Sequence, residues 1–184
     1  MDLEKGISYI AFGFLFTLVN LNLTFNGATV NFMPSFIGWF LIFLACGEFG
    51  EYSDEKPYLK WFALVLALCS AAVWMLETFK PELLPDMIKT VVSCAEAVCM
   101  FLLFSVLENI AGDLNSPRAD KIGFLKYFNL IVYIAFAGLT IFGAVIKNGP
   151  LILMGVFAGV VCLAAAIYTM FVLFGLRKEV KNTL

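Results

Sequence analysis

The sequence contains no histidine and has few charged residues. Histidine is a common metal ligand and the usual general base near neutral pH, so its absence leaves proton chemistry to carboxylates. Charged residues make up 14% of the chain, with 12 basic and 14 acidic side chains and no basic cluster. Neither a nucleic-acid interface nor a polybasic lipid-binding segment is therefore expected.

Motifs of catalytic and cofactor-binding sites are also missing. The chain has no C-x-x-C pair, no G-x-S-x-G, no H-E-x-x-H and no P-loop. Its cysteines lie in apolar stretches and are predicted to be small buried hydrophobic residues: Cys46, Cys69, Cys94, Cys99 and Cys162. We therefore expect no enzyme activity, no metal and no cofactor.

Apolar residues, in contrast, are abundant. They make up 62% of the 184 residues and give a mean hydropathy of +0.94, whereas a soluble domain is about 45–50% apolar. Runs near the roughly 20 residues needed to cross a bilayer occur at 4–21, 34–50, 58–78, 87–108, 124–146 and 151–176. The sequence predicts an all-α integral membrane protein, with residues 1–184 forming one six-helix transmembrane domain in the lipid bilayer.

Basic residues predict the orientation of this bundle, because cytoplasmic segments retain lysine and arginine. One side would carry Lys5, Lys56, Lys60, Arg118, Lys121, Lys126, Arg177, Lys178 and Lys181. The other side would carry Lys80, Lys89 and Lys147. Both termini are therefore predicted to be cytoplasmic, in a cell membrane of the bacterial inner-membrane type. No cleavable signal is expected at the first span.

The segment "NLNLTFNGATVNF", residues 20–32, predicts a β-hairpin between the first two helices. The Asn26-Gly27 pair suits a type I′ turn, and apolar and polar residues alternate on both sides of it. On the first strand, the apolar face would be formed by Leu21, Leu23 and Phe25. We expect this face to lie on the outer helix ends, because an isolated two-stranded hairpin is marginally stable in water.

The first span is unusually short. Its uninterrupted apolar part, residues 7–19, gives about 20 Å of helix against a hydrocarbon core of roughly 30 Å. One interpretation is that it ends below the outer surface, which would place Asn20 and Asn22 in a recess. The alternative is that the helix begins near Asp2 and tilts.

Glu96 is the most conspicuous polar residue, because it lies near mid-membrane in "VVSCAEAVCMFLLF". Ser93 and Met100 share its helix face. One interpretation is proton coupling or recognition of a cationic or hydrogen-bonding ligand. The other is a structural hydrogen bond to Ser, Thr, Asn or Tyr of a neighbouring helix.

Other polar and aromatic residues are less distinctive. Glu77 follows Trp74 at the outer end of the third span, and we expect Trp39, Trp61 and Trp74 to belong to an aromatic belt rather than a stacking pocket. The candidate ligand-binding residues are Asn20, Asn22, Trp74, Glu77 and Glu96.

Gly155-x-x-x-Gly159 in the sixth span permits close helix approach. It could serve packing within the bundle, a homo-oligomer or a membrane partner protein. Two functional hypotheses follow. One is a membrane protein that binds a small molecule from the outer side, as a transporter or its substrate-binding subunit. The other is a non-catalytic accessory protein that stabilises or regulates a partner through helix contacts.

The segment "VNFMPSFIGWFLIFLACGEF", residues 30–49, resembles a block in small bacterial multi-pass membrane proteins of unestablished activity. The matching positions are Phe32, Met33, Pro34, Phe36, Ile37, Gly38 and Trp39. That group often has Asp after the proline, where this chain has Ser35. The resemblance implies no activity, but Pro34 suits a helix start and Gly38 permits another element to approach its backbone.

In architecture alone, the expected fold is similar to the substrate-binding subunits of energy-coupling-factor vitamin transporters. These have six helices, cytoplasmic termini and an outer first loop that can cover the ligand. Their A-x-x-x-A signature on the first helix is not matched, since Ala11 is followed four residues later by Leu15. The resemblance therefore implies a fold rather than docking to a transport motor.

Overall fold

The computed structural model describes residues 2–18, 22–25, 28–31, 34–49, 56–79, 83, 85–143 and 149–183. For the strands, for residues 136–143 and 149–159, and for residues 18, 56, 86, 133, 162 and 183, it describes the backbone alone. The described helices are α1 (Leu3–Leu18), α2 (Ser35–Glu48), α3 (Lys56–Phe79), α4 (Asp86–Asp113), α5 (Ala119–Gly143) and α6 (Gly149–Thr183). The predicted all-α class is confirmed, and each predicted apolar segment lies largely within one of these helices.

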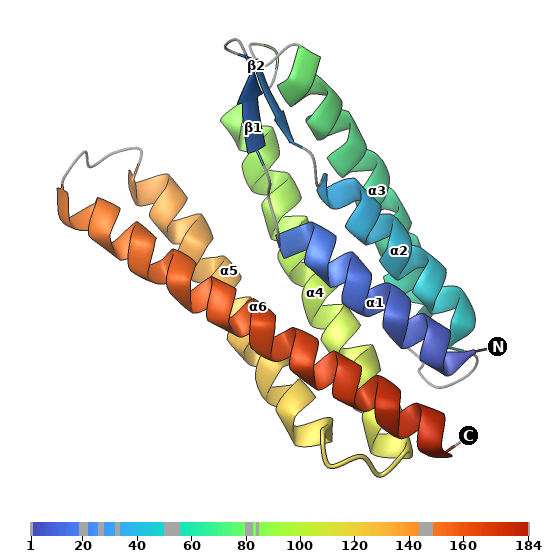
Figure 1. The fold of residues 1–184 in the computed structure, drawn as a ribbon. Helices are drawn as coiled ribbons and strands as arrows, with labels where there is room; N and C mark the ends of the chain where they lie inside the picture. Colours follow the sequence, from blue (N-terminus) through green and yellow to red (C-terminus); the bar gives the residue numbers. More distant parts are fainter. Residues whose placement is uncertain are drawn as a thin grey trace.

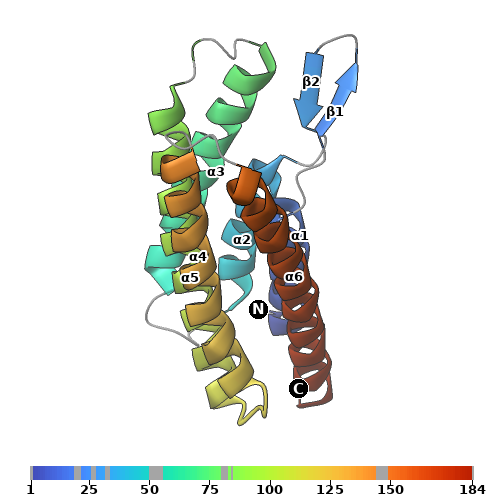
Figure 2. The same cartoon turned by 90° about the vertical axis from the view of Figure 1, so that its left-hand side faces the viewer.

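The helices pack side by side, as Figures 1 and 2 show from two directions. α1 contacts α2 and α6, α2 also contacts α3, and α4 contacts α3 and α5. Both chain termini lie at one end of the bundle, which we call the terminus end, and the two strands lie at the opposite end, the hairpin end. With 16 and 14 residues, α1 and α2 are about 24 and 21 Å long, so they are much shorter than α3 and α4.

Two short strands connect α1 and α2. β1 (Asn22–Phe25) pairs antiparallel with β2 (Ala28–Asn31), with Phe25 opposite Ala28 and Asn22 opposite Asn31. β2 also contacts α3, which brings the strands beside the upper part of that helix. The apolar face of the strands is predicted to lie on the outer helix ends. The strand side chains lie outside the described residues, so this stays a prediction.

Proline and asparagine mark several helix boundaries. Pro34 and Pro85 are the N-cap residues of α2 and α4, and both adopt an extended backbone. A proline at this boundary loses no helical hydrogen bond, since the first N–H groups of a helix lack partners. At the other end of α4, Asn115 has φ 50°, and the N–H of Ser116 donates to the carbonyl of Ala111. Asparagine tolerates this left-handed conformation, which ends the helix.

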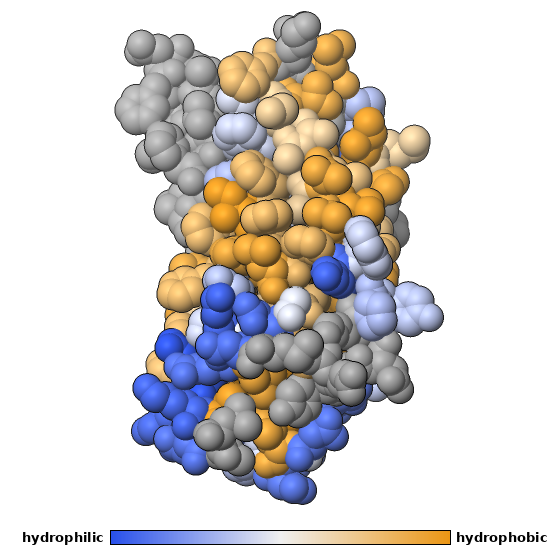
Figure 3. All heavy atoms as spheres, turned by 90° about the vertical axis from the view of Figure 1, so that its right-hand side faces the viewer, coloured by the Kyte–Doolittle hydropathy of each residue, from blue (hydrophilic) through white to orange (hydrophobic). Residues whose placement is uncertain are grey.

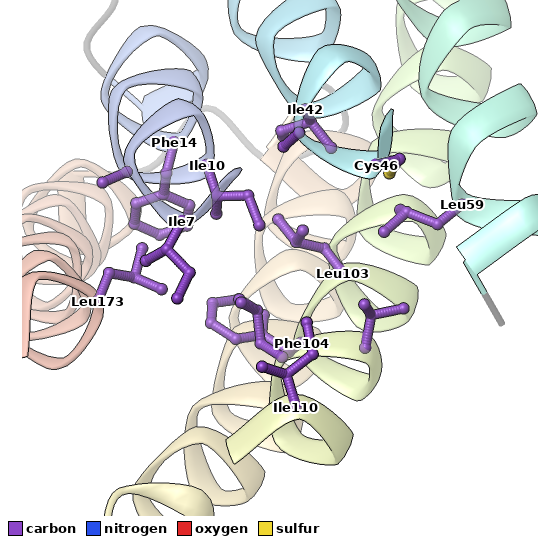
Figure 4. Packing of buried hydrophobic residues seen from close by; sticks show 14 of the residues in the cluster. Ile7, Ile10, Phe14, Ile42, Cys46, Leu59, Leu103, Phe104, Ile110 and Leu173 are labelled. Atoms are coloured by element: carbon purple, nitrogen blue, oxygen red, sulfur yellow. The ribbon is translucent and has the colours of Figure 1, made fainter. Parts of the chain in front are cut away.

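The buried core includes side chains of α1, α2, α3 and α4 and of the terminus ends of α5 and α6. Figure 4 shows Ile7 and Ile10 of α1 facing Leu173 of α6 and the side chains of α4. Phe14 and Phe104 meet edge to face, with ring centroids 6.0 Å apart. Aromatic pairs prefer this geometry, and its dispersion contacts hold α1 against α4.

Two glycines let α1 and α2 cross closely. A Cβ added at Gly13 would lie 2.7 Å from the carbonyl oxygen of Gly38, and a Cβ added at Gly38 would overlap the Gly13 carbonyl and the Thr17 methyl group. Neither helix could carry a side chain at this point without moving. The prediction that Gly38 permits close approach is therefore confirmed, and its partner is the backbone of α1.

Large apolar side chains cover much of the described outer surface. They include Trp61, Val65 and Leu68 of α3, Val91 and Val98 of α4, Phe124, Ile131 and Ile134 of α5, and Leu163, Ile167 and Phe171 of α6. Figure 3 shows one such apolar face, with hydrophilic residues gathered mainly at the terminus end. Soluble monomers rarely expose apolar surface of this extent.

Two of the described helical stretches, Pro57–Phe79 and Met87–Asp113, are long and apolar enough to cross a membrane. Only 28% and 33% of their most apolar windows are buried within the protein. A core helix of a soluble protein would be mostly buried, so these values favour membrane association.

Candidate functional site

Glu96 contacts a tryptophan of a neighbouring helix. The Trp39 indole Nε1–H of α2 donates to Glu96 Oε1 of α4 across 3.2 Å. Trp39 is fully buried, and Glu96 is partly buried. A buried indole N–H normally requires an acceptor, so this contact satisfies Trp39. Within the described part of the chain, no donor to the second oxygen of Glu96 is present.

Trp74 contacts the helix that carries Trp39. Its ring meets Phe36 of α2 at 5.7 Å between centroids. Phe36 and Trp39 are three residues apart and therefore share a face of α2. The predicted residues Trp74 and Glu96 thus both contact this face of α2, Trp74 at Phe36 and Glu96 at Trp39.

Glu77 belongs to a different contact. Its Oε1 lies 3.1 Å from the ammonium of Lys89, and both side chains are nearly half exposed. This ion pair joins the hairpin ends of α3 and α4, about two turns from Glu96 along α4. The structure therefore does not bring Glu77 into contact with Glu96.

The two predicted asparagines add no described side-chain contact. Asn22 begins β1, and its side chain lies outside the described residues, as does the whole of Asn20. Their proposed positions in a recess stay predictions.

Charge compensation is absent around Glu96 among the residues that the structure describes, because no lysine or arginine pairs with it. The described residues also contain no group of three potential metal-ligating side chains. The chemistry available at this place is that of one carboxylate, one indole N–H and several aromatic rings. Such an arrangement can accept hydrogen bonds or attract a cation.

The terminus end carries most of the described ion pairs. Glu4 of α1 accepts from Arg177 of α6 at 2.8 Å, and Lys5 of α1 pairs with Glu48 of α2 at 3.2 Å. The other two described pairs are Glu108 with Lys126 and Arg118 with Glu179. They connect α4 with α5 and the α4–α5 turn with α6, so ionic contacts link helices at this end of the bundle.

Trp39 belongs to this candidate site although the sequence did not predict it there. Its assignment to an aromatic belt is wrong, because the side chain is fully buried, whereas Trp61 is exposed as expected. The partner expected for Glu96 was Ser, Thr, Asn or Tyr, and the observed donor is an indole. The positions of Trp39 and Glu96 in the sequence do not show that α2 and α4 face each other. The contact between them could therefore not be predicted from the sequence.

The cysteine prediction holds in part. Cys46 and Cys99 are buried, but Cys69 and Cys94 are exposed on the apolar faces of α3 and α4.

The glycines of the sixth span belong to the helical backbone of α6. Around Gly155 and Gly159 the structure describes the backbone alone, so the side-chain contacts of these glycines lie outside the described residues. Their role in helix packing or partner binding stays a prediction.

The fold and this site define a helical bundle with large apolar outer faces and a carboxylate–indole pair between α2 and α4. No protein-family model, curated protein or solved structure matched the chain. The functional interpretation therefore depends on the chemistry of its own residues.

Proposed function

We propose that the chain is a multi-pass membrane protein of the bacterial inner-membrane type, with both termini in the cytoplasm. The apolar outer faces support this proposal, since lipid can cover them without cost. The described basic residues also support the orientation, because Lys5, Arg118, Lys126 and Arg177 belong to the terminus end, whereas Lys89 belongs to the hairpin end.

The spacing of ion pairs along α4 agrees with the thickness of a bilayer. Lys89 pairs at the hairpin end and Glu108 at the terminus end. They are 19 residues apart in one helix, which corresponds to about 28 Å, close to the roughly 30 Å of a hydrocarbon core. In this frame Glu96 lies about 10 Å below the outer boundary.

This topology is tested with reporter fusions. A reporter active only in the cytoplasm, fused after Leu184, should be active, and one inserted between β1 and β2 should be inactive. The opposite pattern would overturn the orientation, and activity of both fusions would overturn the multi-pass arrangement.

We propose that this protein binds a small molecule from the outer side, as a transporter or its substrate-binding subunit. The observation that carries the proposal is the Trp39–Glu96 contact near the hairpin ends of the short helices. α2 begins four residues before Trp39, about 6 Å along the helix axis. A ligand entering beneath the strands would therefore reach Glu96 within the outer half of the membrane.

Native mass spectrometry tests this proposal. The protein is purified in mild detergent, and spectra are recorded before and after gradual delipidation. We expect a small-molecule adduct on the wild type that is lost from Glu96→Gln. Glu108→Gln is the matched control, because it makes the same substitution on the same helix at the terminus end, and it should retain the adduct.

The outcomes separate the two functional hypotheses. An adduct that persists equally in Glu96→Gln would remove Glu96 from the site. A protein without an adduct that carries a stoichiometric membrane partner would favour the accessory function. In that case Gly159→Leu should release the partner, because the larger side chain would block close helix approach.

A further inference from the structure

Ser70 of α3 differs from five other hydroxyl-bearing residues of the described helices. Five described side chains donate to a carbonyl three or four residues earlier in their own helix: Ser8, Thr17, Thr78, Ser105 and Thr169. Ser70 is 4% exposed, and its Oγ has no hydrogen-bond partner among the described residues. A buried hydroxyl without a partner is unfavourable, particularly where water is excluded.

Helix geometry places Ser70 near the depth of the Trp39–Glu96 contact. Trp74 of α3 contacts Phe36 of α2, and the two helices run in opposite directions. Ser70 lies four residues, about 6 Å, from Trp74 toward the terminus end, and Trp39 lies three residues, about 4.5 Å, from Phe36 in the same direction. Starting from the contact between Trp74 and Phe36, both residues therefore lie about one helical turn farther toward the terminus end.

Ser70 also lies on the inward face of its helix. Ala63 and Ala67 precede it at helical spacing on the buried side of α3. The helices that α3 contacts are α2 and α4, which carry Trp39 and Glu96. The unpartnered hydroxyl is therefore buried at the junction that holds the carboxylate.

From this arrangement we propose that Ser70 is a second polar contact of the ligand site, and that the ligand is a small organic ammonium compound with a further hydrogen-bonding group. The inference rests on the proposed small-molecule function. No described lysine or arginine pairs with Glu96, and the ammonium group of the ligand supplies this missing cationic partner. The Ser70 hydroxyl binds the second polar group of the ligand, to which it can donate or accept.

The aromatic residues suit the same ligand class. Trp39, Trp74 and Phe36 are aromatic residues of the helices that meet here, and the faces of such rings attract ammonium groups. They also provide an apolar lining for the remainder of a small ligand. An anionic ligand would instead meet the Glu96 carboxylate without a compensating lysine or arginine in the described part of the chain.

Three matched probes test the ligand class. Phenethylamine carries the ammonium group, 2-amino-1-phenylethanol adds a hydroxyl, and 2-phenylethanol lacks the ammonium group. Binding to the full chain in nanodiscs is followed by tryptophan fluorescence, because two of the three tryptophans lie at the junction. We expect phenethylamine to bind at least tenfold more weakly to Glu96→Gln than to the wild type, and 2-phenylethanol to bind both equally weakly.

The hydroxylated probe tests Ser70. We expect the added hydroxyl to increase affinity for the wild type about fivefold, as one net hydrogen bond would, and Ser70→Ala to abolish this gain while phenethylamine binds unchanged. Ser93→Ala is the control, because Ser93 is an exposed serine of α4, and it should retain the gain.

Each contrary result overturns a defined part of the inference. A hydroxyl gain that survives in Ser70→Ala removes Ser70 from the site. Absence of phenethylamine binding to the wild type at millimolar concentration excludes the ammonium class. The broader proposal fails separately, since it requires the adduct in native mass spectra to be lost from Glu96→Gln.

Discussion

Gly38→Ala should separate α1 from α2. A Cβ on Gly38 would lie 2.6 Å from the Thr17 methyl carbon and closer still to the Gly13 carbonyl oxygen, whereas ordinary contact begins at 3.4 Å. The difference from the Thr17 methyl carbon, 3.4 − 2.6, is 0.8 Å, and the overlap with the Gly13 carbonyl is larger. A backbone carbonyl cannot rotate away as a flexible side chain can, so relief requires displacement of a whole helix.

The expected cost is about 2–3 kcal/mol of the free energy of unfolding, the upper part of the range for overpacked cores. The displacement should also reach the proposed ligand site, because Trp39 is the next residue of α2. Its indole lies 3.2 Å from Glu96 Oε1, so a shift of α2 by about 0.8 Å that moves Trp39 away from α4 would exceed hydrogen-bonding distance. Gly38→Ala should therefore lower both stability and ligand retention.

The assay is reversible unfolding in mixed micelles, combined with native mass spectrometry of the ligand adduct. Gly47→Ala in α2 and Gly112→Ala in α4 are matched controls, because a Cβ at either position has nothing within 4 Å. Both should be neutral or stabilised by up to about 1 kcal/mol, since alanine favours helix over glycine. Equal stability of Gly38→Ala and Gly47→Ala would refute the close-crossing argument.

Three further predictions concern polar contacts and are measured by the same unfolding assay. Ser70→Ala should stabilise the ligand-free protein by about 1 kcal/mol, because it removes a buried hydroxyl without a partner; a loss of stability would indicate a partner. Trp39→Phe should cost about 1–2 kcal/mol, since it deletes the donor to Glu96; unchanged stability would refute this contribution of the hydrogen bond. A double-mutant cycle on Glu4 and Arg177 should give a coupling free energy of about 0.5 kcal/mol, because both side chains are about one-third exposed. This coupling free energy should decrease as the salt concentration rises.

The positions of the helices could be predicted from the sequence because lipid-compatible apolar runs are long and uninterrupted. Pro34 is at the start of α2 as predicted, and Gly38 permits the predicted close approach. These properties depend on the local chain alone, so one sequence is enough to recognise them.

The partners within the site could not be predicted, because rotation of each helix about its axis leaves little trace in the sequence. In a soluble bundle the apolar face marks the core. Here Trp61 and Trp39 are similarly apolar in context, yet one is exposed and the other fully buried. Lipid and protein interiors are similarly apolar, so hydrophobicity does not distinguish the two faces. The burial of Ser70 depends on the rotation of α3 in the same way, so it could not be predicted from the sequence.

The chemistry of glutamine distinguishes a structural role of Glu96 from a ligand-binding role. Its side-chain carbonyl oxygen can accept from the Trp39 indole as a carboxylate does, so Glu96→Gln retains the described hydrogen bond. A purely structural Glu96 would therefore tolerate this change in both stability and binding, whereas Glu96→Leu would leave the buried indole N–H unpaired and lower stability. A ligand-binding Glu96 predicts that Glu96→Gln folds as well as the wild type but loses the adduct. Because the hydrogen bond survives in Glu96→Gln, loss of ligand in that variant would come from the other end of the carboxyl group, where a charged acceptor oxygen is replaced by a neutral NH2 donor.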